Sequence, residues 1–268
     1  MESTTLAAPG NGTALWSVRQ TLLGSMQLRL MSWNIHRAIG MDRKFSPDRI
    51  IEVVKHHKPD ILLMQEVDRG VPRSRRLWLD HEVSKACGFP WHAWAQAHVL
   101  KEGSYGNATL SNFPIFKRKH LDLTIAWKKR RSALYTRLRL PGHYKDFHVF
   151  NWHLGLSSLE RKKQVEKLFR SGTWKSLRKN ARVILGGDTN DWRNLLFHKV
   201  VKQEGLHAWS EHRRRQHILT YPSPAPAGAL DKFFWRGPLG EEHIHRSRMN
   251  LAKVASDHLP LLAEFELT

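Results

Sequence analysis

Polar residues end several short apolar segments of this 268-residue chain, and this pattern constrains the fold more than any other feature. The segments, such as LMSW, DILLM and VIL, have the length and composition of buried strands. An open α/β sheet collects its functional side chains where such strands end. The polar residues that follow or interrupt these segments are Asn34, Glu66, His153, Asp188, Asn190, Asp257 and His258.

The types of these residues indicate a chemistry. An amide oxygen beside a carboxylate is a common way to hold Mg²⁺, and Asn34 and Glu66 end neighbouring apolar segments. Carboxylates and histidines also perform acid–base catalysis. Each residue alone has a structural alternative: Glu66 could pair with a basic group, residues 188–190 could form an ordinary turn, and His153 could be a core histidine. Together they favour a metal-dependent hydrolase.

Length and cysteine content favour one large domain in a reducing compartment. No internal low-complexity linker divides the chain, and the single Cys87 excludes an intramolecular disulfide. No run of about 18 apolar residues predicts a membrane-spanning helix. The first 25 residues lack the pattern of a signal peptide. We therefore expect a flexible extension over residues 1–25, a folded domain over 26–268, and a monomeric, cytoplasmic protein.

The net charge is strongly positive. The chain has 44 Lys and Arg against 24 Asp and Glu, a formal charge of +20. Basic residues cluster at 128–131 and 213–215. Either cluster alone could be a solvated surface, but the total favours a polyanionic partner, either nucleic acid or an anionic lipid surface.

Apolar spacing and breaker residues predict an α/β (α+β) fold. Ser46 and Pro47 are typical of the start of a helix over SPDRIIEVVKHH, and further helices are expected over 77–87, 158–177 and 195–203, with Ser158 as an N-cap. Many short strands with few helices indicate two packed sheets with helices outside them. The expected strands cover 28–33, 60–64, 91–97, 107–111, 115–122, 133–140, 146–152, 182–185 and 261–266.

Seven motifs in order resemble the endonuclease/exonuclease/phosphatase superfamily, and the resemblance covers residues 28–268. They are SWNIH (32–36), LMQEVD (63–68), YGNATLSNFPI (105–115), NWHLGLSSLERKKQ (151–164), LGGDTNDW (185–192), ALDKFF (229–234) and ASDHLPL (255–261). The resemblance is to a compact bacterial branch. It implies a pancreatic deoxyribonuclease-like fold, a four-layer sandwich with two mixed β-sheets flanked by helices.

The resemblance also implies a site for Mg²⁺ or Mn²⁺. The Glu of the QE motif is the main metal ligand of the family and corresponds to Glu66. Asn34 would help to position the metal, and Asp257 would lie near it.

Catalytic roles follow from the same resemblance. His258 would be the general base, and Asp231 would hydrogen-bond it and stabilise its charged form. Asp188 and Asn190 would orient the attacking water and bind the phosphate, and His153 would contact the phosphate or protonate the leaving group. Four further residues are candidates for phosphate binding, although Tyr105 could equally be a packing residue: Arg73, Tyr105, Asn107 and Arg131.

Two positions depart from the family motifs. The usual GDFN is GDTN here, so Thr189 replaces an aromatic residue that normally packs beneath the loop. The strand after LD begins with Lys232, which places a charge beside Asp231. The first departure could loosen the loop, and the second leaves the role of Asp231 less secure than that of His258.

Three functions are compatible with these motifs. A nuclease that hydrolyses DNA, expected to act as an endonuclease, fits the charge of +20 best. A phospholipid, sphingomyelin-type or small-molecule phosphodiesterase, or a phosphatase, is the alternative. An inactive adaptor is disfavoured because every expected catalytic residue type is present.

Overall fold

The structure is a computed structural model that describes residues 26–142, 146–209 and 217–267. The expected extension over 1–25 and the basic cluster at 213–215 lie outside the described residues.

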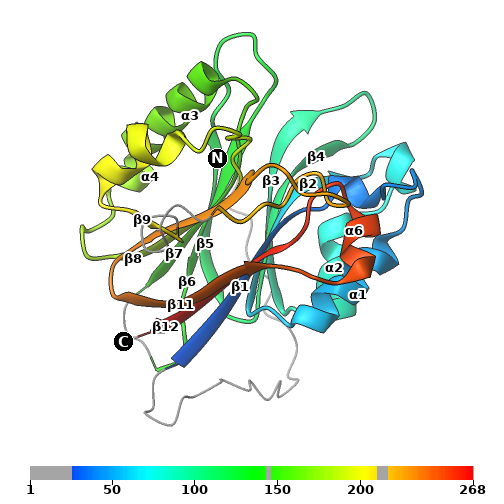
Figure 1. Cartoon of the computed structure of the whole chain (residues 1–268), viewed down its shortest axis with the longest axis horizontal. Coiled ribbons are helices and arrows are strands. Elements are labelled where there is room, and N and C mark those ends of the chain that lie inside the picture. The colour runs from blue at the N-terminus through cyan, green and yellow to red at the C-terminus, as the bar shows by residue number, and fades with distance from the viewer. Residues whose placement is uncertain (1–25, 143–145, 210–216, 268) are drawn as a thin grey trace.

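Two six-stranded sheets face each other (Figure 1). In order across the first sheet, its strands are β11 (Leu239–Arg246), β12 (Leu261–Leu267), β1 (Met26–Asn34), β2 (Ile61–Arg69), β4 (Ser104–Ser111) and β3 (Trp91–Val99). Those of the second are β5 (Ile115–Asp122), β6 (Ser132–Leu138), β7 (Phe147–His153), β8 (Arg182–Asp188), β10 (Asp231–Arg236) and β9 (His207–Ala208).

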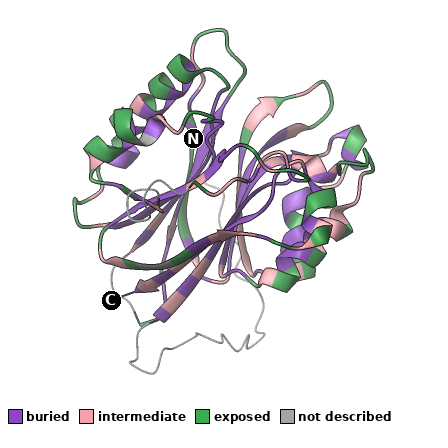
Figure 2. Cartoon of the chain, viewed as in Figure 1, coloured by how far each residue is buried: buried purple, intermediate pink, exposed green. Residues whose placement is uncertain are grey.

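Both sheets are mixed, and helices cover their outer faces. The helices α1 (Pro47–His57), α2 (Leu79–Cys87) and α6 (Asn250–Ala255) lie against the first sheet, and α3 (Ser158–Arg170) and α4 (Gly172–Lys175) lie against the second (Figure 1). Figure 2 shows the strands largely buried between these helices. The expected four-layer α/β sandwich is therefore confirmed. Among the described helices, none is long and apolar enough to cross a membrane.

Three apolar clusters hold the layers together. Alternating strand residues such as Leu30, Leu63 and Val149 meet between the sheets. Residues from the opposite faces of the strands, such as Trp33 and Trp152, pack under the helices on either side. Because both faces of the central strands are buried, these strands read as nearly continuous apolar runs in the sequence.

Two helix predictions need correction. The helix predicted over 158–177 ends at Arg170, because Ser171 adopts an extended conformation and its hydroxyl accepts from the Trp174 backbone N–H at 3.2 Å to start α4. The N-cap of α3 is Ser157 rather than Ser158. The region 195–203 forms a π-helical turn, η3 (Phe197–Val201), and a 3-10 turn, η4 (Lys202–Glu204), instead of one helix.

Candidate active site

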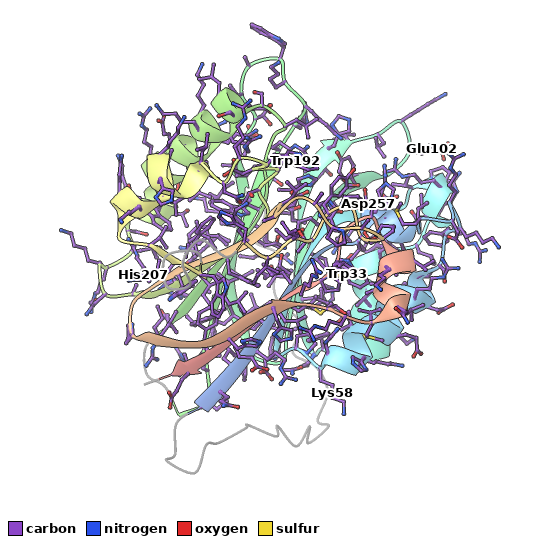
Figure 3. The ribbon with its side chains drawn as sticks, viewed as in Figure 1. Trp33, Lys58, Glu102, Trp192, His207 and Asp257 are labelled. Atoms are coloured by element: carbon purple, nitrogen blue, oxygen red, sulfur yellow. The ribbon has the colours of Figure 1, made fainter. Side chains whose placement is uncertain are left out.

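The strand registers bring the predicted site residues to one edge of the sandwich. In the parallel pair β1–β2, Asn34 lies opposite Gln65, and in the parallel pair β7–β8, His153 lies opposite Asp188. Asp231 starts β10 directly opposite Asp188. The Asn34 amide donates to Asp188 Oδ2 at 3.1 Å and so joins the two sheets at this edge. In Figure 3, Asp257 and Trp192 lie toward this edge, and Lys58 lies at the opposite end of the molecule.

Asp188 is the central carboxylate of the site. Its Oδ2 atom lies 3.3 Å from His153 Nε2 and 3.7 Å from His258 Nε2, while Oδ1 accepts from the Asn190 backbone N–H at 2.9 Å. Burial raises the pKa of Asp188 to about 6, against the opposing attraction of His258. Both histidines therefore share a carboxylate at the end of β8.

His258 is fixed by the carboxylate of Asp231. The imidazole Nδ1 lies 2.8 Å from Asp231 Oδ2, which also accepts from the Thr220 hydroxyl at 2.7 Å. The ring of Tyr221 packs 4.8 Å from that of His258. Burial alone lowers the pKa of His258, but the attraction of Asp231 and Asp188 outweighs it and raises the pKa to about 10. The Nε2 atom is thus left facing Asp188.

The raised pKa of His258 predicts a pH-dependent stability of the metal-free protein. An unfolded histidine titrates near 6.5, so the contribution of His258 is fully present below that pH and is lost as the pH rises through about 10. We expect the free energy of unfolding of the wild type, relative to His258→Gln, to fall between pH 7 and 10. Urea denaturation in EDTA, carried out at several pH values, measures the free energy of unfolding of each protein. A difference between the two proteins that stays constant over this range would contradict the predicted shift.

Arg131 and His153 form a second buried pair. The Arg131 guanidinium donates to His153 Nε2 at 2.8 Å. Burial and the charge of Arg131 keep the pKa of His153 well below its usual value. An arginine can only donate, so Nε2 of His153 is an acceptor and carries no proton in this arrangement. His153 therefore orients Arg131 in this geometry, and the Nε2 atom of His153 is not a proton donor.

Asn190 lies in the loop after β8. Its backbone φ is +50°, a left-handed conformation that asparagine adopts more readily than most residues other than glycine. Its side-chain amide donates to the carbonyl of Leu154 at 3.0 Å, next to His153. The loop thereby places Asn190 between the ends of β7 and β8.

Glu66 lies in a bulge of β2 next to the residue that pairs with Asn34, and Asp257 directly precedes His258. Gln65 and Glu66 form a β-bulge opposite Asn107, and the φ of Glu66 is +55°. The Glu66 carboxylate lies 3.4 Å from Arg37 Nε. Ser256 links Asp257 to the same region, because its hydroxyl donates to the Asn34 carbonyl at 2.7 Å.

The oxygen donors at this edge fit a hard divalent cation. Among the described residues, no three His, Cys, Asp or Glu side chains group as a metal site by themselves. Glu66, Asn34 and Asp257 supply two carboxylates and an amide oxygen, and Asn34 Oδ1 already accepts from the His36 backbone N–H at 3.0 Å. Such a sparse oxygen set suits Mg²⁺ or Mn²⁺, which keep several of their own waters.

The predicted phosphate-binding residues are not all at the centre. Arg73 is held by both oxygens of buried Asp68 at 2.8 Å. Its guanidinium lies 5.9 Å from the ring of Tyr105, whose buried hydroxyl has no hydrogen-bond partner among the described residues. The amide of Asn107 donates to the carbonyls of Ser132 and Asn151 at 3.0 and 3.4 Å, between the sheets. Arg131 alone of the four contacts a predicted catalytic residue.

Buried amides supporting the site were missed in the sequence. Gln65 donates to Asn151 Oδ1 at 2.8 Å, and Asn151 donates to the carbonyls of Met64 and Ala108 in the other sheet. These bonds fix the spacing of the two sheets just below the catalytic edge. A signal was available, because Asn151 precedes His153 by two residues on one strand and therefore points to the same face.

A second support lies under the loop after His153. The Gln164 side chain accepts from the Gly155 N–H at 2.8 Å, and Arg161 donates to the Leu156 carbonyl at 2.6 Å. Arg161 also lies 3.4 Å from Asp191, beyond Asn190. One face of α3 therefore contacts both the loop that follows His153 and the loop that contains Asn190.

Comparisons with known proteins agree with this architecture. A protein of Escherichia coli K12 described as uncharacterized protein YbhP is 28% identical over 247 residues, covering 89% of this chain and 96% of the relative. The endonuclease/exonuclease/phosphatase from Beutenbergia cavernae superposes with a TM-score of 0.72 at 21% identity, covering 90% of this chain and 72% of that one. TDP2 of D. rerio, in a complex with a single-strand DNA product, has a TM-score of 0.66 at 17% identity and covers 89% and 98%.

The structural likenesses are below 25% identity and show a shared fold. A model of the Endonuclease/Exonuclease/phosphatase family matches residues 31–258, which is most of the chain and includes every predicted site residue. The matched region ends at His258, whose contact with Asp231 completes the site. The chain therefore belongs to the Endonuclease/Exonuclease/phosphatase family, whose members hydrolyse phosphoester bonds.

Proposed function

We propose that the protein is a divalent-metal-dependent phosphodiesterase that hydrolyses DNA by in-line attack of water. The observation that carries this proposal is the His258–Asp231 pair at 2.8 Å, with the Nε2 atom of His258 facing Asp188 at 3.7 Å. Activation of water requires a base, a group that orients the base, and positive charge near the water. His258 with Asp231, Asp188 and the oxygen donors of the cation site supply these parts.

The cation would be held by Glu66, with Asn34 and Asp257 beside it. When bound, Mg²⁺ or Mn²⁺ supplies positive charge that polarises the non-bridging phosphate oxygens and offsets the field of the site carboxylates. Glu66 is suited to this role because its bulged backbone carries the carboxylate to the edge where Asn34 ends β1. The sparse protein donor set leaves room for water and phosphate oxygens.

The proton and the phosphate would be handled by the remaining residues. The raised pKa keeps His258 protonated in the metal-free protein, and the positive charge of a bound cation would lower that pKa. The neutral imidazole then takes a proton from water at Nε2 while Nδ1 remains bonded to Asp231, and Asp188 orients the same water. Arg131, held by His153, and the amide of Asn190 donate to phosphate oxygens as negative charge develops. The hydroxyl of Tyr105, which has no hydrogen-bond partner in the described part of the chain, would supply a further donor.

DNA is favoured as the substrate by charge and by aromatic residues near the site. The formal charge of +20 suits a polymer with one phosphate per nucleotide. Trp192, two residues after Asn190, is exposed and packs 5.6 Å from the ring of Tyr221, so that its indole is available to stack on a base. A structural relative, TDP2 of D. rerio, has been solved with a single-strand DNA product.

Digestion of supercoiled plasmid tests the proposal. We expect nicking by the purified protein with Mg²⁺ or Mn²⁺ and none in EDTA, because the oxygen site needs its cation. Substrate binding should weaken steeply, by about 10³-fold or more between 50 and 200 mM salt, if six or more phosphates are contacted. A protein that cleaves bis(p-nitrophenyl) phosphate but neither nicks nor degrades DNA would exclude DNA as the substrate.

A phospholipid phosphodiesterase is the second candidate, and a specific surface favours it. Three large apolar side chains, in the segments before Arg131 and after His153, are the most exposed of those described, at 91% for Trp127, 73% for Leu156 and 64% for Leu159. Exposed lysines and an arginine follow Trp127 at 128–130. Apolar groups beside basic ones suit an anionic membrane surface. Turnover of anionic phospholipid in vesicles, without DNA cleavage, would select this candidate.

A further inference from the structure

Lys232 of β10 is a partly buried cation that contacts the loop after β8. Its ammonium group donates to the Thr189 hydroxyl at 3.3 Å, to the Asp191 carbonyl at 3.3 Å and to the Ala229 carbonyl. An ammonium has three N–H donors, so each of them has an acceptor here. Two loops, 189–191 and 229–230, are thus joined through one nitrogen atom.

The loop joined in this way carries two of the predicted catalytic residues. Thr189 lies between Asp188 and Asn190, and its hydroxyl donates to the Leu230 carbonyl at 2.7 Å while accepting from Lys232. Asn190 has a φ of +50°, a left-handed conformation that asparagine tolerates better than most residues and that contacts on either side can hold in place. The contacts of Lys232 on either side of Asn190 are suited to enforcing it.

Charge explains why a lysine is tolerated at this position. Asp188, Asp191 and Asp231 are all buried around it. Burial lowers the pKa of Lys232 to about 8, against the opposing attraction of these three carboxylates. The carboxylates thus offset part of the cost of burying the ammonium group, and the ammonium group in turn offsets negative charge beside the site.

We propose that Lys232 is a positioning residue whose ammonium group fixes residues 189–191, so that Asp188 and Asn190 stay aligned with His258 and His153. The inference rests on the proposed function in one respect, because it assigns the aligned residues to phosphoester hydrolysis. Thr189 and Lys232 both lie where the chain departs from the expected motifs, and they contact each other.

Three variants test the role of the ammonium group: Lys232→Met removes it, Lys232→Arg keeps a positive charge, and Lys85→Met is a control on the exposed surface of α2. With bis(p-nitrophenyl) phosphate and Mn²⁺, we expect Lys232→Met to lower kcat at least about 10-fold with little change in KM, since misalignment acts on the reacting atoms. Lys232→Arg should recover part of kcat, because its planar group keeps the charge but not the three-way geometry.

Amide hydrogen exchange gives a readout independent of turnover. In Lys232→Met we expect the amides of residues 189–191 to exchange roughly 10-fold faster, while exchange elsewhere matches the wild type. Lys85→Met should be unchanged throughout. Thr189→Val should show a smaller effect at the same amides, and it should add little to Lys232→Met because the two residues share one contact.

Two outcomes would overturn the inference. In the first, loop exchange and kcat of Lys232→Met match those of the wild type. In the second, exchange rises evenly along the chain, melting temperature falls, and Lys232→Arg is as impaired as Lys232→Met, which indicates a general structural role. If the wild type itself has no turnover but loop exchange rises locally, the proposed function fails and the loop-holding role of Lys232 is supported.

Discussion

Replacing His258 with alanine is expected to lower kcat for a phosphodiester substrate at least about 100-fold, the usual scale for loss of a general base. The side chain is buried, its Nδ1 is held by Asp231 at 2.8 Å, and its Nε2 faces Asp188. Alanine removes the group that accepts the proton of water and leaves Asp231 without its cationic partner. Steady-state hydrolysis of bis(p-nitrophenyl) phosphate and plasmid nicking both measure the loss.

A matched control separates catalysis from folding. His120 on β5 is exposed and has no assigned role in the site, so His120→Ala should retain wild-type turnover. Circular dichroism and melting temperature establish whether His258→Ala is folded, which matters because Trp33 Nε1 donates to the His258 carbonyl at 2.8 Å in the core. Folded His258→Ala with turnover close to that of the wild type would remove His258 from the mechanism.

The ends of the buried strands could be predicted from the sequence because burial leaves a simple pattern there. Asn34, His153 and Asp188 follow apolar runs, and the parallel pairs β1–β2 and β7–β8 place these ends at one edge. The order of the seven motifs then identified the family. The pattern could not predict which side chains contact each other. Arg131 donates to His153 because β6 pairs with β7, and no local signal in the sequence encodes that pairing.

Other features depended on contacts between distant segments. The bulge at Glu66 has no glycine or proline to mark it. The contact between Thr189 and Lys232 joins residues 43 positions apart. Each of these was invisible to a local pattern and is set by tertiary packing.

Replacing Glu66 with glutamine is expected to remove metal-dependent turnover, again by roughly 100-fold or more, because a neutral amide is a much weaker ligand for a hard cation. Glutamine has the same shape, so the bulge and the strand pairing should remain. The substitution also removes the ion pair with Arg37, which contributes little where both groups are partly exposed. Folding stability should therefore change less than metal affinity.

Metal binding is the measurement that distinguishes a ligand from a structural carboxylate. Calorimetric titration with Mn²⁺ should show binding to the wild type that is weakened at least about 10-fold in Glu66→Gln, while Glu52→Gln on the exposed face of α1 binds as the wild type does. A residual rate that recovers at high Mn²⁺ would agree with weakened binding. Unchanged Mn²⁺ affinity in Glu66→Gln would instead move the cation site away from β2, toward Asp188 and Asp257. His258 would then have to act directly beside the cation, because Asp188 lies 3.7 Å from the Nε2 atom of His258.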